Sequence, residues 1–171
     1  MRRAHEPPEL GAPLDFLRRL WELNHAIERL SSKMERTIGV TAQQRLVLRC
    51  VGKLPGIGAS ELAALLHLDR GTVSASLRRL TDRGLMRRTC DPSDGRRVTL
   101  VLTASGRTLD VAATGTVEHA VDSLLRQTPD KEVEATALVL SRLAELLRTA
   151  HLSDVPGAQR PKRRAGGARA T

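Results

Sequence analysis

The feature that most restricts the fold is a change of hydrophobic period between residues 70 and 102. Up to residue 83, apolar residues recur at the i, i+4 and i+7 spacing of one helix face, at Val73, Leu77 and Leu80. Towards residue 102 they alternate with other residues, as in a strand, at Val98, Leu100 and Leu102. Because a loop that contains Pro and Gly precedes this second stretch, we predict a β-hairpin of residues 85–90 and 97–102 directly after a helix.

Capping signals mark the helices that come before this hairpin. Thr41 and Asp69 occupy positions where an N-cap side chain would accept a hydrogen bond from a free helical N–H group. Gly84 occupies the C′ position, where a left-handed residue ends a helix. Helices are therefore expected over about residues 42–53, 59–66 and 70–83. Short helices joined by a tight turn and followed by a hairpin form a winged helix-turn-helix pattern.

Longer helical patterns lie on both sides of this winged segment. Residues 14–37 carry one apolar stripe, at Phe16, Leu20, Leu23, Ile27, Leu30 and Met34. A long helix is expected from about residue 104 to Leu125, and a last helix follows to about Ala150, with Thr128 as N-cap and Pro129 at N1. The predicted fold class is mainly α with a small β-hairpin wing. Spacing alone leaves open whether the first stripe faces the chain's own core or a second subunit.

Length and composition suit one compact domain with an extension at each end. Of the 171 residues 40% are apolar, and the core must be mostly aliphatic because Phe16 and Trp21 are the only aromatic residues. We expect a flexible arm over residues 1–13 and a disordered basic tail over residues 151–171. No apolar run reaches the roughly 18–20 residues of a membrane span, and no signal-peptide pattern begins the chain, so a cytoplasmic location is expected.

The net charge of +9 is concentrated in two segments. Residues 70–97 carry a net charge of +5, residues 156–171 carry another +5, and the rest of the chain carries −1. Clustered positive charge indicates a polyanionic partner, most often nucleic acid. The alternative is that the Arg-rich composition reflects codon usage. The charge of the tail is expected to attract any DNA alike, because it releases counterions without reading bases.

The face of the predicted 70–83 helix that lies opposite its core positions is polar and basic. A helix that enters the major groove needs such a face, with small residues where the backbone comes close to the bases. Hydroxyl groups near the helix N-terminus suit phosphate, and arginines further along suit bidentate contacts to guanine. The alternative is an ordinary solvated helix face. The candidate DNA contacts here are Arg70, Thr72, Ser74, Ala75, Arg78 and Arg79.

The predicted hairpin tip carries a second candidate contact. Arg96 stands at the end of a narrow ribbon, and an Arg inserted into a narrow minor groove meets concentrated negative potential. Asp94 stands two residues earlier and could hold the guanidinium in one orientation. Arg97 follows directly and is a candidate for DNA contact as well. The alternative is an ion pair in a surface turn, which contributes almost nothing to stability.

Two runs of this sequence resemble the MarR family of bacterial transcription factors. The first run consists of Glu61-Leu62-Ala63, Leu68-Asp69-Arg70-Gly71-Thr72-Val73-Ser74 and Leu80-Thr81-Asp82-Arg83-Gly84-Leu85. The second is Asp91-Pro92-Ser93-Asp94-Gly95-Arg96-Arg97, followed by Leu102-Thr103 and Gly106. Asp94 and Arg96 match the family's Asp-x-Arg at the wing tip, whose Arg enters the minor groove. Gly58 departs from the family, which more often has Ser, Thr or Asn at that cap.

The resemblance covers about residues 14–150 and implies a MarR-type domain there. In that domain residues 41–102 would be the DNA-binding lobe, and residues 14–37 and 104–150 would be dimerisation helices. The resemblance also implies a homodimer on a pseudo-palindromic operator, acting as a repressor that a small ligand, often phenolic or another lipophilic anion, releases from double-stranded DNA. The first helix and the last two carry more apolar surface than one small lobe can cover, which agrees with a dimer. Trp21 and His25 are the candidates for lining the ligand cleft.

Two other functions are kept as alternatives. One is a winged-helix protein-interaction module without a specific operator, which would have no need of an Arg at the wing tip. The other is a redox-responsive regulator. In it the Cys90 thiol, which has Arg87, Arg88 and Arg96 near it in the sequence, reacts with oxidants. Neither Cys50 nor Cys90 suggests a disulfide scaffold, and the histidines form no pair at ligand spacing, so no metal or cofactor is expected. Because no catalytic motif occurs, we do not expect an enzyme.

Overall fold

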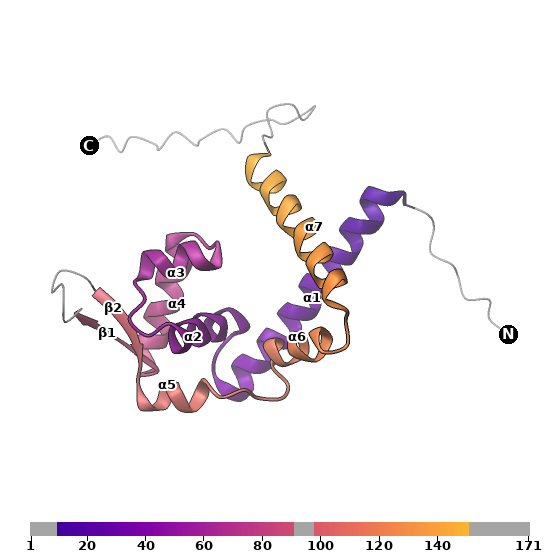
Figure 1. Cartoon of the computed structure of the whole chain (residues 1–171). Helices are drawn as coiled ribbons and strands as arrows, with labels where there is room; N and C mark the ends of the chain where they lie inside the picture. The colour runs from indigo at the N-terminus through magenta and orange to yellow at the C-terminus, as the bar shows by residue number, and fades with distance from the viewer. Residues whose placement is uncertain (1–9, 91–97, 151–171) are drawn as a thin grey trace, which may run out of the picture. The chain divides into compact units, whose positions relative to one another are not determined.

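The computed structural model describes residues 10–90 and 98–150 of the chain. In chain order the elements are α1 (Ala12–Ile38), α2 (Ala42–Lys53), α3 (Ala59–Leu66), α4 (Arg70–Asp82), β1 (Met86–Cys90), β2 (Val98–Leu102), α5 (Ala104–Leu109), α6 (Val117–Leu125) and α7 (Asp130–Thr149) (Figure 1). The described residues divide into two compact units, one up to residue 124 and one from residue 125 on. The predicted fold class, mainly α with a small hairpin, is confirmed.

Local hydrogen bonds explain where the central helices begin and end. Thr41 Oγ1 accepts from the Gln44 backbone N–H at 3.2 Å, and Gln44 Oε1 accepts from the Thr41 N–H at 3.2 Å, which closes a capping box on α2. Asp69 Oδ1 accepts from the Thr72 N–H at 2.8 Å at the start of α4. Gly84 has a φ of +66° just after α4, the left-handed conformation that ends a helix. The predicted caps at Thr41, Asp69 and Gly84 are therefore confirmed.

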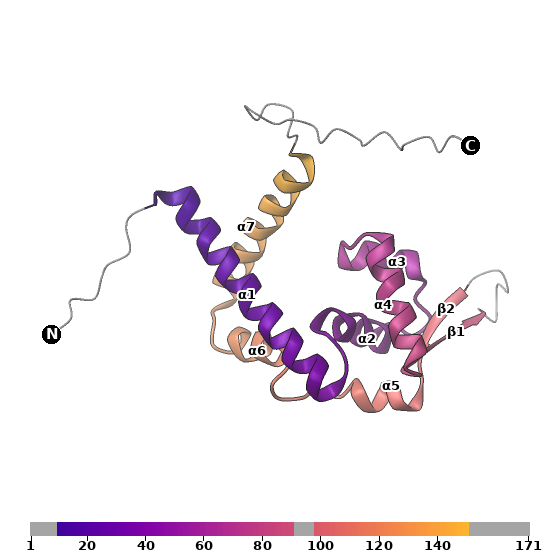
Figure 2. The same ribbon diagram turned by 180° about the vertical axis from the view of Figure 1, so that it is seen from behind.

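Residues 40–102, here called the winged lobe, enclose one aliphatic core. Figures 1 and 2 show α2, α3 and α4 gathered beside the hairpin, with α5 close to the base of β2. The predicted core side of α4 is buried as expected. The largest fully buried side chain of the described residues is not apolar, however; it is Arg45 on α2. The apolar core residues are Val40, Val47, Leu48, Val51, Leu62, Ala63, Val73, Leu77, Leu80, Leu85, Met86, Leu100 and Leu102.

The hairpin pairs β1 and β2 antiparallel, from Met86 opposite Leu102 to Cys90 opposite Val98. Leu100 and Leu102 of β2 are buried, whereas Val98 is 52% exposed. The reason is that the far end of the hairpin extends beyond the helices of the lobe (Figure 1). Thr99 is buried instead, and its hydroxyl lies 2.9 Å from that of Thr89 across the strands.

The predicted long helix from residue 104 to Leu125 is wrong, because the chain breaks into α5 and α6. The connector, residues 110–116, contains Gly115 at a φ of +76°, which an α-helix does not tolerate. Thr116 Oγ1 accepts from the His119 N–H at 3.3 Å and so caps the new helix α6. The Leu109 carbonyl at the end of α5 accepts from Arg45 of α2, 64 residues away in the sequence.

Two helix starts also differ slightly from the predictions. Helix α1 begins at Ala12, two residues before the expected start, with Pro13 in its first turn. Helix α7 begins at Asp130 with Pro129 as the cap residue, one position later than expected from Thr128 as the cap. The rest of the expected arm, residues 1–9, and the expected tail, residues 151–171, lie outside the described residues.

Helices α1, α6 and α7 leave much of their apolar surface uncovered. Of the 27 residues of α1 only Met34 is buried, and α6 and α7 have no buried residue. Among the described residues, no helix is both long and apolar enough to cross a membrane. The exposed large apolar side chains of these helices are Leu14, Phe16, Leu17, Trp21, Leu23, Ile27, Val121, Leu124, Leu125, Leu138, Val139, Leu140, Leu146 and Leu147.

Candidate nucleic-acid interface

Helix α4 presents two different faces. Its core face is fully buried in the lobe, whereas Arg70, Ser74, Ala75, Arg78 and Arg79 are all exposed. The structure thus brings five of the predicted contact residues onto the exposed side of one helix. No hydrogen bond or ion pair within the described residues holds the guanidinium of Arg78 or Arg79, so both groups can reach a partner.

Thr72 has a different role from the other predicted contacts. It is half-buried, its hydroxyl donates to Asp69 Oδ2, and its backbone N–H donates to Asp69 Oδ1 at 2.8 Å. The hydrogen bond from the Thr72 hydroxyl, followed by that from the backbone, holds the pKa of the Asp69 carboxyl below its usual range. The start of α4 therefore carries a carboxylate of its own. A phosphate at this end would have to meet Arg70 rather than the capped N–H groups.

A polar cavity of about 380 Å³ joins α4 to the start of α2 and extends the candidate interface beyond the predicted residues. Gln43 Nε2 donates to Ser76 Oγ at 3.4 Å, which ties the two helices together at this point. Sequence reasoning missed Gln43, although a polar residue two positions after the Thr41 cap was a usable signal. The residues that line the cavity are Ser31, Thr41, Gln43, Gln44, Thr72, Ala75, Ser76 and Arg79.

Strands β1 and β2 form the base of the predicted wing, and the end of β1 lies opposite the start of β2. Arg87 and Arg88 on β1 are exposed, and β1 ends at Cys90 directly opposite the start of β2. The predicted wing contacts Asp94, Arg96 and Arg97 lie outside the described residues and stay predictions. Cys90 is exposed and free, and its proposed reaction with oxidants also stays a prediction. Burial raises the pKa of the thiol of Cys50.

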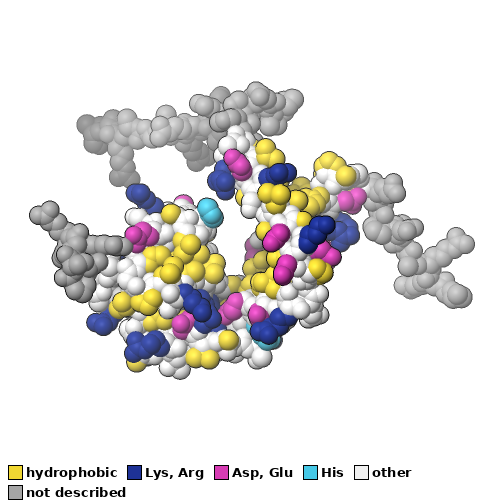
Figure 3. All heavy atoms as spheres, in the orientation of Figure 1, with side chains coloured by type: hydrophobic (Ala, Val, Ile, Leu, Met, Phe, Trp, Pro, Cys, Tyr) yellow, Lys and Arg dark blue, Asp and Glu magenta, His cyan; other side chains and the backbone are white. Residues whose placement is uncertain are grey.

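An open groove of about 690 Å³ runs along α1, on the part of the helix that contains His25. Its lining combines an apolar floor with cationic groups, Arg29, Lys33 and Arg36, and one acid, Glu22. Trp21 is 69% exposed and lies one turn before His25 on α1, outside the lining of the groove, and both stay predicted ligand contacts. Across the described ranges, no three His, Cys, Asp or Glu side chains are grouped to hold a metal ion. Figure 3 shows charged side chains scattered among apolar ones over the visible face of the molecule.

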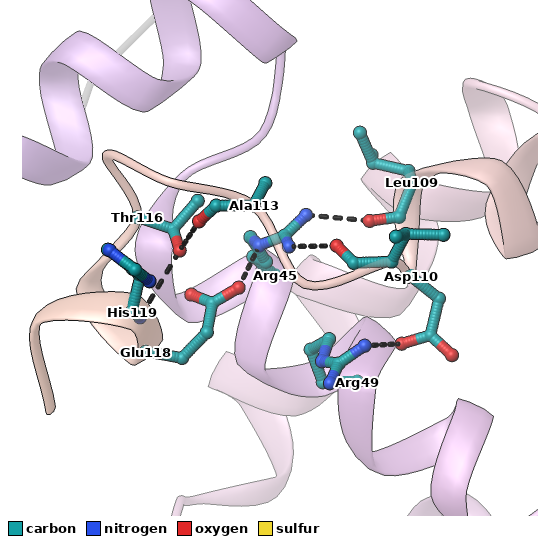
Figure 4. A network of polar contacts seen from close by, with 9 residues as sticks. Arg45, Arg49, Leu109, Asp110, Ala113, Thr116, Glu118 and His119 are labelled. Carbon is teal, nitrogen blue, oxygen red and sulfur yellow. Dashed lines mark hydrogen bonds and ion pairs between the residues drawn. The ribbon is translucent and has the colours of Figure 1, made fainter. Parts of the chain in front are cut away.

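A buried polar network connects α2 to the α5–α6 connector (Figure 4). Arg45, which is 1% exposed, donates from Nη1 to the Leu109 carbonyl at 2.6 Å and from Nη2 to the Val111 carbonyl at 2.8 Å. Its Nε donates to the carboxylate of Glu118 in the first turn of α6. Arg49, one turn further along α2, donates to Asp110 Oδ1 at 2.9 Å. Sequence reasoning missed this network.

Comparison with known proteins decides the family. Residues 40–98 match the family model described as the MarR family. The HTH-type transcriptional repressor Rv2887 of Mycobacterium tuberculosis is 30% identical over 109 residues, which are 64% of this chain and 77% of that relative. The chain belongs to the MarR family. It is therefore a DNA-binding transcriptional regulator with a winged helix. The family indicated by the resemblance in the sequence is confirmed.

Two solved structures of MarR-family regulators resemble the chain. The S. aureus MepR–DNA complex has 25% sequence identity and a TM-score of 0.61, covering 77% of this chain and 96% of MepR. The PcaV regulator of Streptomyces coelicolor in complex with its natural ligand has 26% identity and a TM-score of 0.62, covering 84% of this chain and 99% of PcaV. MarR-type folds similar to this chain thus bind DNA in one case and a ligand in the other.

Proposed function

We propose that the protein is a homodimeric repressor that binds a pseudo-palindromic operator and leaves it when a small ligand binds. The observation that carries this proposal is that different helices of the described residues expose surfaces of different chemistry. Helix α4 exposes a basic face that no other part of the described chain covers, while α1, α6 and α7 expose apolar faces. The repressor role is supported by the name of the relative Rv2887.

The exposed face of α4 is proposed to read the major groove. Ser74 and Ala75 are short enough to let the helix backbone approach the bases, and Arg78 and Arg79 have free guanidinium groups for guanine or phosphate. Arg96 at the wing tip is proposed to enter the adjacent minor groove, with Asp94 orienting it and Arg97 contacting the backbone. Arg70 is proposed to contact phosphate at the start of α4, with Thr72 acting through the cap.

A second copy of the chain is the proposed cover for the apolar helices. Leucines that are half to two-thirds exposed on α6 and α7, such as Leu124 and Leu147, form surfaces that a monomer in water does not usually leave open. A two-fold dimer places its two recognition helices about 34 Å apart, one turn of DNA, only if its interface has the right geometry. Dimerisation is therefore proposed to set which operator spacing the protein accepts.

The groove on α1 is the proposed ligand site. Its apolar floor and its cations Arg29, Lys33 and Arg36 suit a lipophilic anion, and His25 could donate a further hydrogen bond. The similar regulator PcaV was solved with a natural ligand, which supports a ligand for this fold. A ligand weakens DNA binding only if it binds better to a dimer geometry that does not fit the operator.

The experiment that tests the proposal is genome-wide selection of DNA fragments by the purified protein. A shared palindromic motif among the selected fragments is expected, and Arg96→Ala should weaken binding to it by about 1–3 kcal/mol, the size of one good contact in a groove. Fragments with no common motif, or an Arg96→Ala protein with unchanged affinity, would contradict the proposal. The first of these results would favour a winged module that binds proteins.

A further inference from the structure

Arg45 is an unusual residue for the interior of a small aliphatic lobe. Its side chain is 1% exposed, and it lies on α2 between positions that belong to the apolar core. A guanidinium buried this deeply is unfavourable unless its donors and its charge are satisfied. Here all three kinds of nitrogen donate: two to the carbonyls of Leu109 and Val111, and one to the carboxylate of Glu118.

The three partners of Arg45 share one property: each belongs to the segment that leads from the lobe into α6. Leu109 ends α5, Val111 lies in the connector, and Glu118 lies in the first turn of α6. One planar side chain therefore bonds to the end of α5, to the connector and to the first turn of α6 (Figure 4). The fork of the guanidinium spans these partners at once, which a Lys ammonium does not.

The same face of α2 carries two more residues that fit this segment. Arg45, Arg49 and Gly52 follow at i, i+4 and i+7, so they form one stripe along the helix. Arg49 bonds to Asp110 Oδ1 at 2.9 Å, and a Cβ atom at Gly52 would lie only 2.2 Å from Asp110 Oδ2. Gly52 thus leaves the room that the Asp110 carboxylate occupies. The stripe matches the connector in charge and in shape.

The connector is also close to α1. A cavity of about 210 Å³ is lined on one side by Met34 and Ile38 of α1 and on the other by Ala113 and Thr116 of the connector. The connector therefore lies against both helices that precede α3. It leads directly into α6, whose exposed apolar side chains include Val121 and Leu124. A movement of the connector would change the direction of that apolar surface relative to α4.

We propose that Arg45 is a positioning residue for DNA binding: it fixes the orientation of α6 relative to the recognition helix α4. Arg45 does not touch DNA. It acts by holding the connector against α2, which in turn packs against α4 through the core of the lobe. In the dimer this orientation sets the separation of the two recognition helices; that last step rests on the proposed function.

The first experiment measures the orientation directly and does not depend on an operator. Cysteines for spin labels replace the exposed residues Thr81 on α4 and His119 on α6, in a protein that carries Cys50→Ala and Cys90→Ser. Labelled protein is diluted about tenfold with unlabelled protein, so that mass action leaves mostly distances within one chain. Pulsed electron resonance should give one narrow distance distribution for the parent and a broad one for Arg45→Met and Arg45→Lys.

The two substitutions separate positioning from folding. Met has nearly the length of Arg without its donors, and because it leaves Glu118 and two carbonyl groups without their partner, Arg45→Met should also destabilise the lobe. If Arg45→Met fails to fold, Arg45→Lys decides, because it keeps the charge and loses only the fork. The control is Lys53→Met, which removes a cation from the exposed end of the same helix. A distribution as narrow as that of the parent in a folded Arg45 variant overturns the proposal.

The second experiment reads the consequence for DNA. Arg45→Lys should bind the full palindromic site about tenfold or more weakly than the parent, because the second half-site is misplaced, but an isolated half-site about equally well. Lys53→Met should change both affinities by the same small factor. Equal losses on both sites for Arg45→Lys would show a general folding defect and overturn the positioning role. If the parent itself prefers no palindrome, the proposed function is wrong. The spin-label distances then still test whether Arg45 fixes the orientation of α6 relative to α4.

Discussion

The winged lobe and the flanking helices use the same aliphatic residues but cover them differently. In the lobe, the apolar core residues are at most 8% exposed, whereas α6 and α7 have no buried residue at all. Both regions show the apolar spacing that predicts one covered helix face. The difference teaches that periodicity identifies which face of a helix will be covered, but not whether the cover comes from the same chain. The predictions below probe this contrast.

The largest effect is expected from opening the core of the lobe. Leu77→Ala removes a fully buried side chain of α4 and should lower the free energy of unfolding by about 2–5 kcal/mol, because it leaves a cavity in an aliphatic core. The matched control is Leu65→Ala on α3, where the side chain is 49% exposed and the loss should be below about 1 kcal/mol. Urea unfolding measures both values. Similar losses for the two leucines would contradict the burial described here.

The next largest effect is expected on dimerisation through the apolar face of α6. Leu124→Glu places a charge on the apolar face of α6, and each copy should lose about 1.5–3 kcal/mol of the dimer interface that we propose. Sedimentation equilibrium should show the variant dissociating at concentrations where the parent is dimeric. His119→Glu introduces the same charge at an exposed position of α6 outside that face and serves as the control. An unchanged oligomeric state for Leu124→Glu would refute the proposed interface.

A comparable or smaller effect separates the two faces of α4 itself. Arg79→Ala should weaken binding to a selected operator by about 1–3 kcal/mol, while the free energy of unfolding stays the same, since the side chain is exposed and unbonded. Lys53→Ala removes an exposed cation of α2 and reports how much a single charge contributes by itself. Fluorescence anisotropy measures both affinities. Equal losses for Arg79 and Lys53 would mean that Arg79 supplies only charge.

The smallest effect is a pH dependence at the start of α4. Because its pKa is lowered in the folded protein, the Asp69 carboxylate stabilises the fold above its unfolded pKa, and this contribution is lost as the pH falls through the lower, folded value. Asp69→Ala should therefore destabilise the protein at pH 7, and the difference from the parent should shrink below about pH 4. Asp69→Asn, which keeps an acceptor for the Thr72 N–H, is the control. Thermal unfolding across this pH range measures the difference, and a pH-independent difference would contradict the assignment.

Much of the lobe could be predicted because its signals are local. The Thr41 and Asp69 caps bond to residues three positions away, and the core side of α4 follows from spacing within a single helix. The exposed positions of Ala75, Arg78 and Arg79 follow from the same geometry. These contacts need no knowledge of the rest of the chain. Alternation, by contrast, does not reveal where a hairpin extends beyond its core, and Val98 at the far end of β2 is exposed.

The α5–α6 break and the Arg45 network could not be predicted in this way. Arg45 bonds to residues 64 to 73 positions further along the chain, and an Arg on a helix is ordinarily expected in water. The alanines near residue 112 favour a continuous helix, but Gly115, the Thr116 cap and the contacts of α2 with the connector together break it. The signal in the sequence, the stripe of Arg45, Arg49 and Gly52, has meaning only once its partners are known.

The sequence by itself determined the winged helix, its caps, the polar face of α4 and the family that the chain resembles. Each of these depends on residues within a few turns of one another, where backbone geometry determines which side chains lie on the same face. Only the tertiary structure decided that a charged residue, Arg45, fills the interior of the lobe and that the chain breaks before α6. Those outcomes depend on contacts between distant segments, which compete for the same carbonyl groups and the same space.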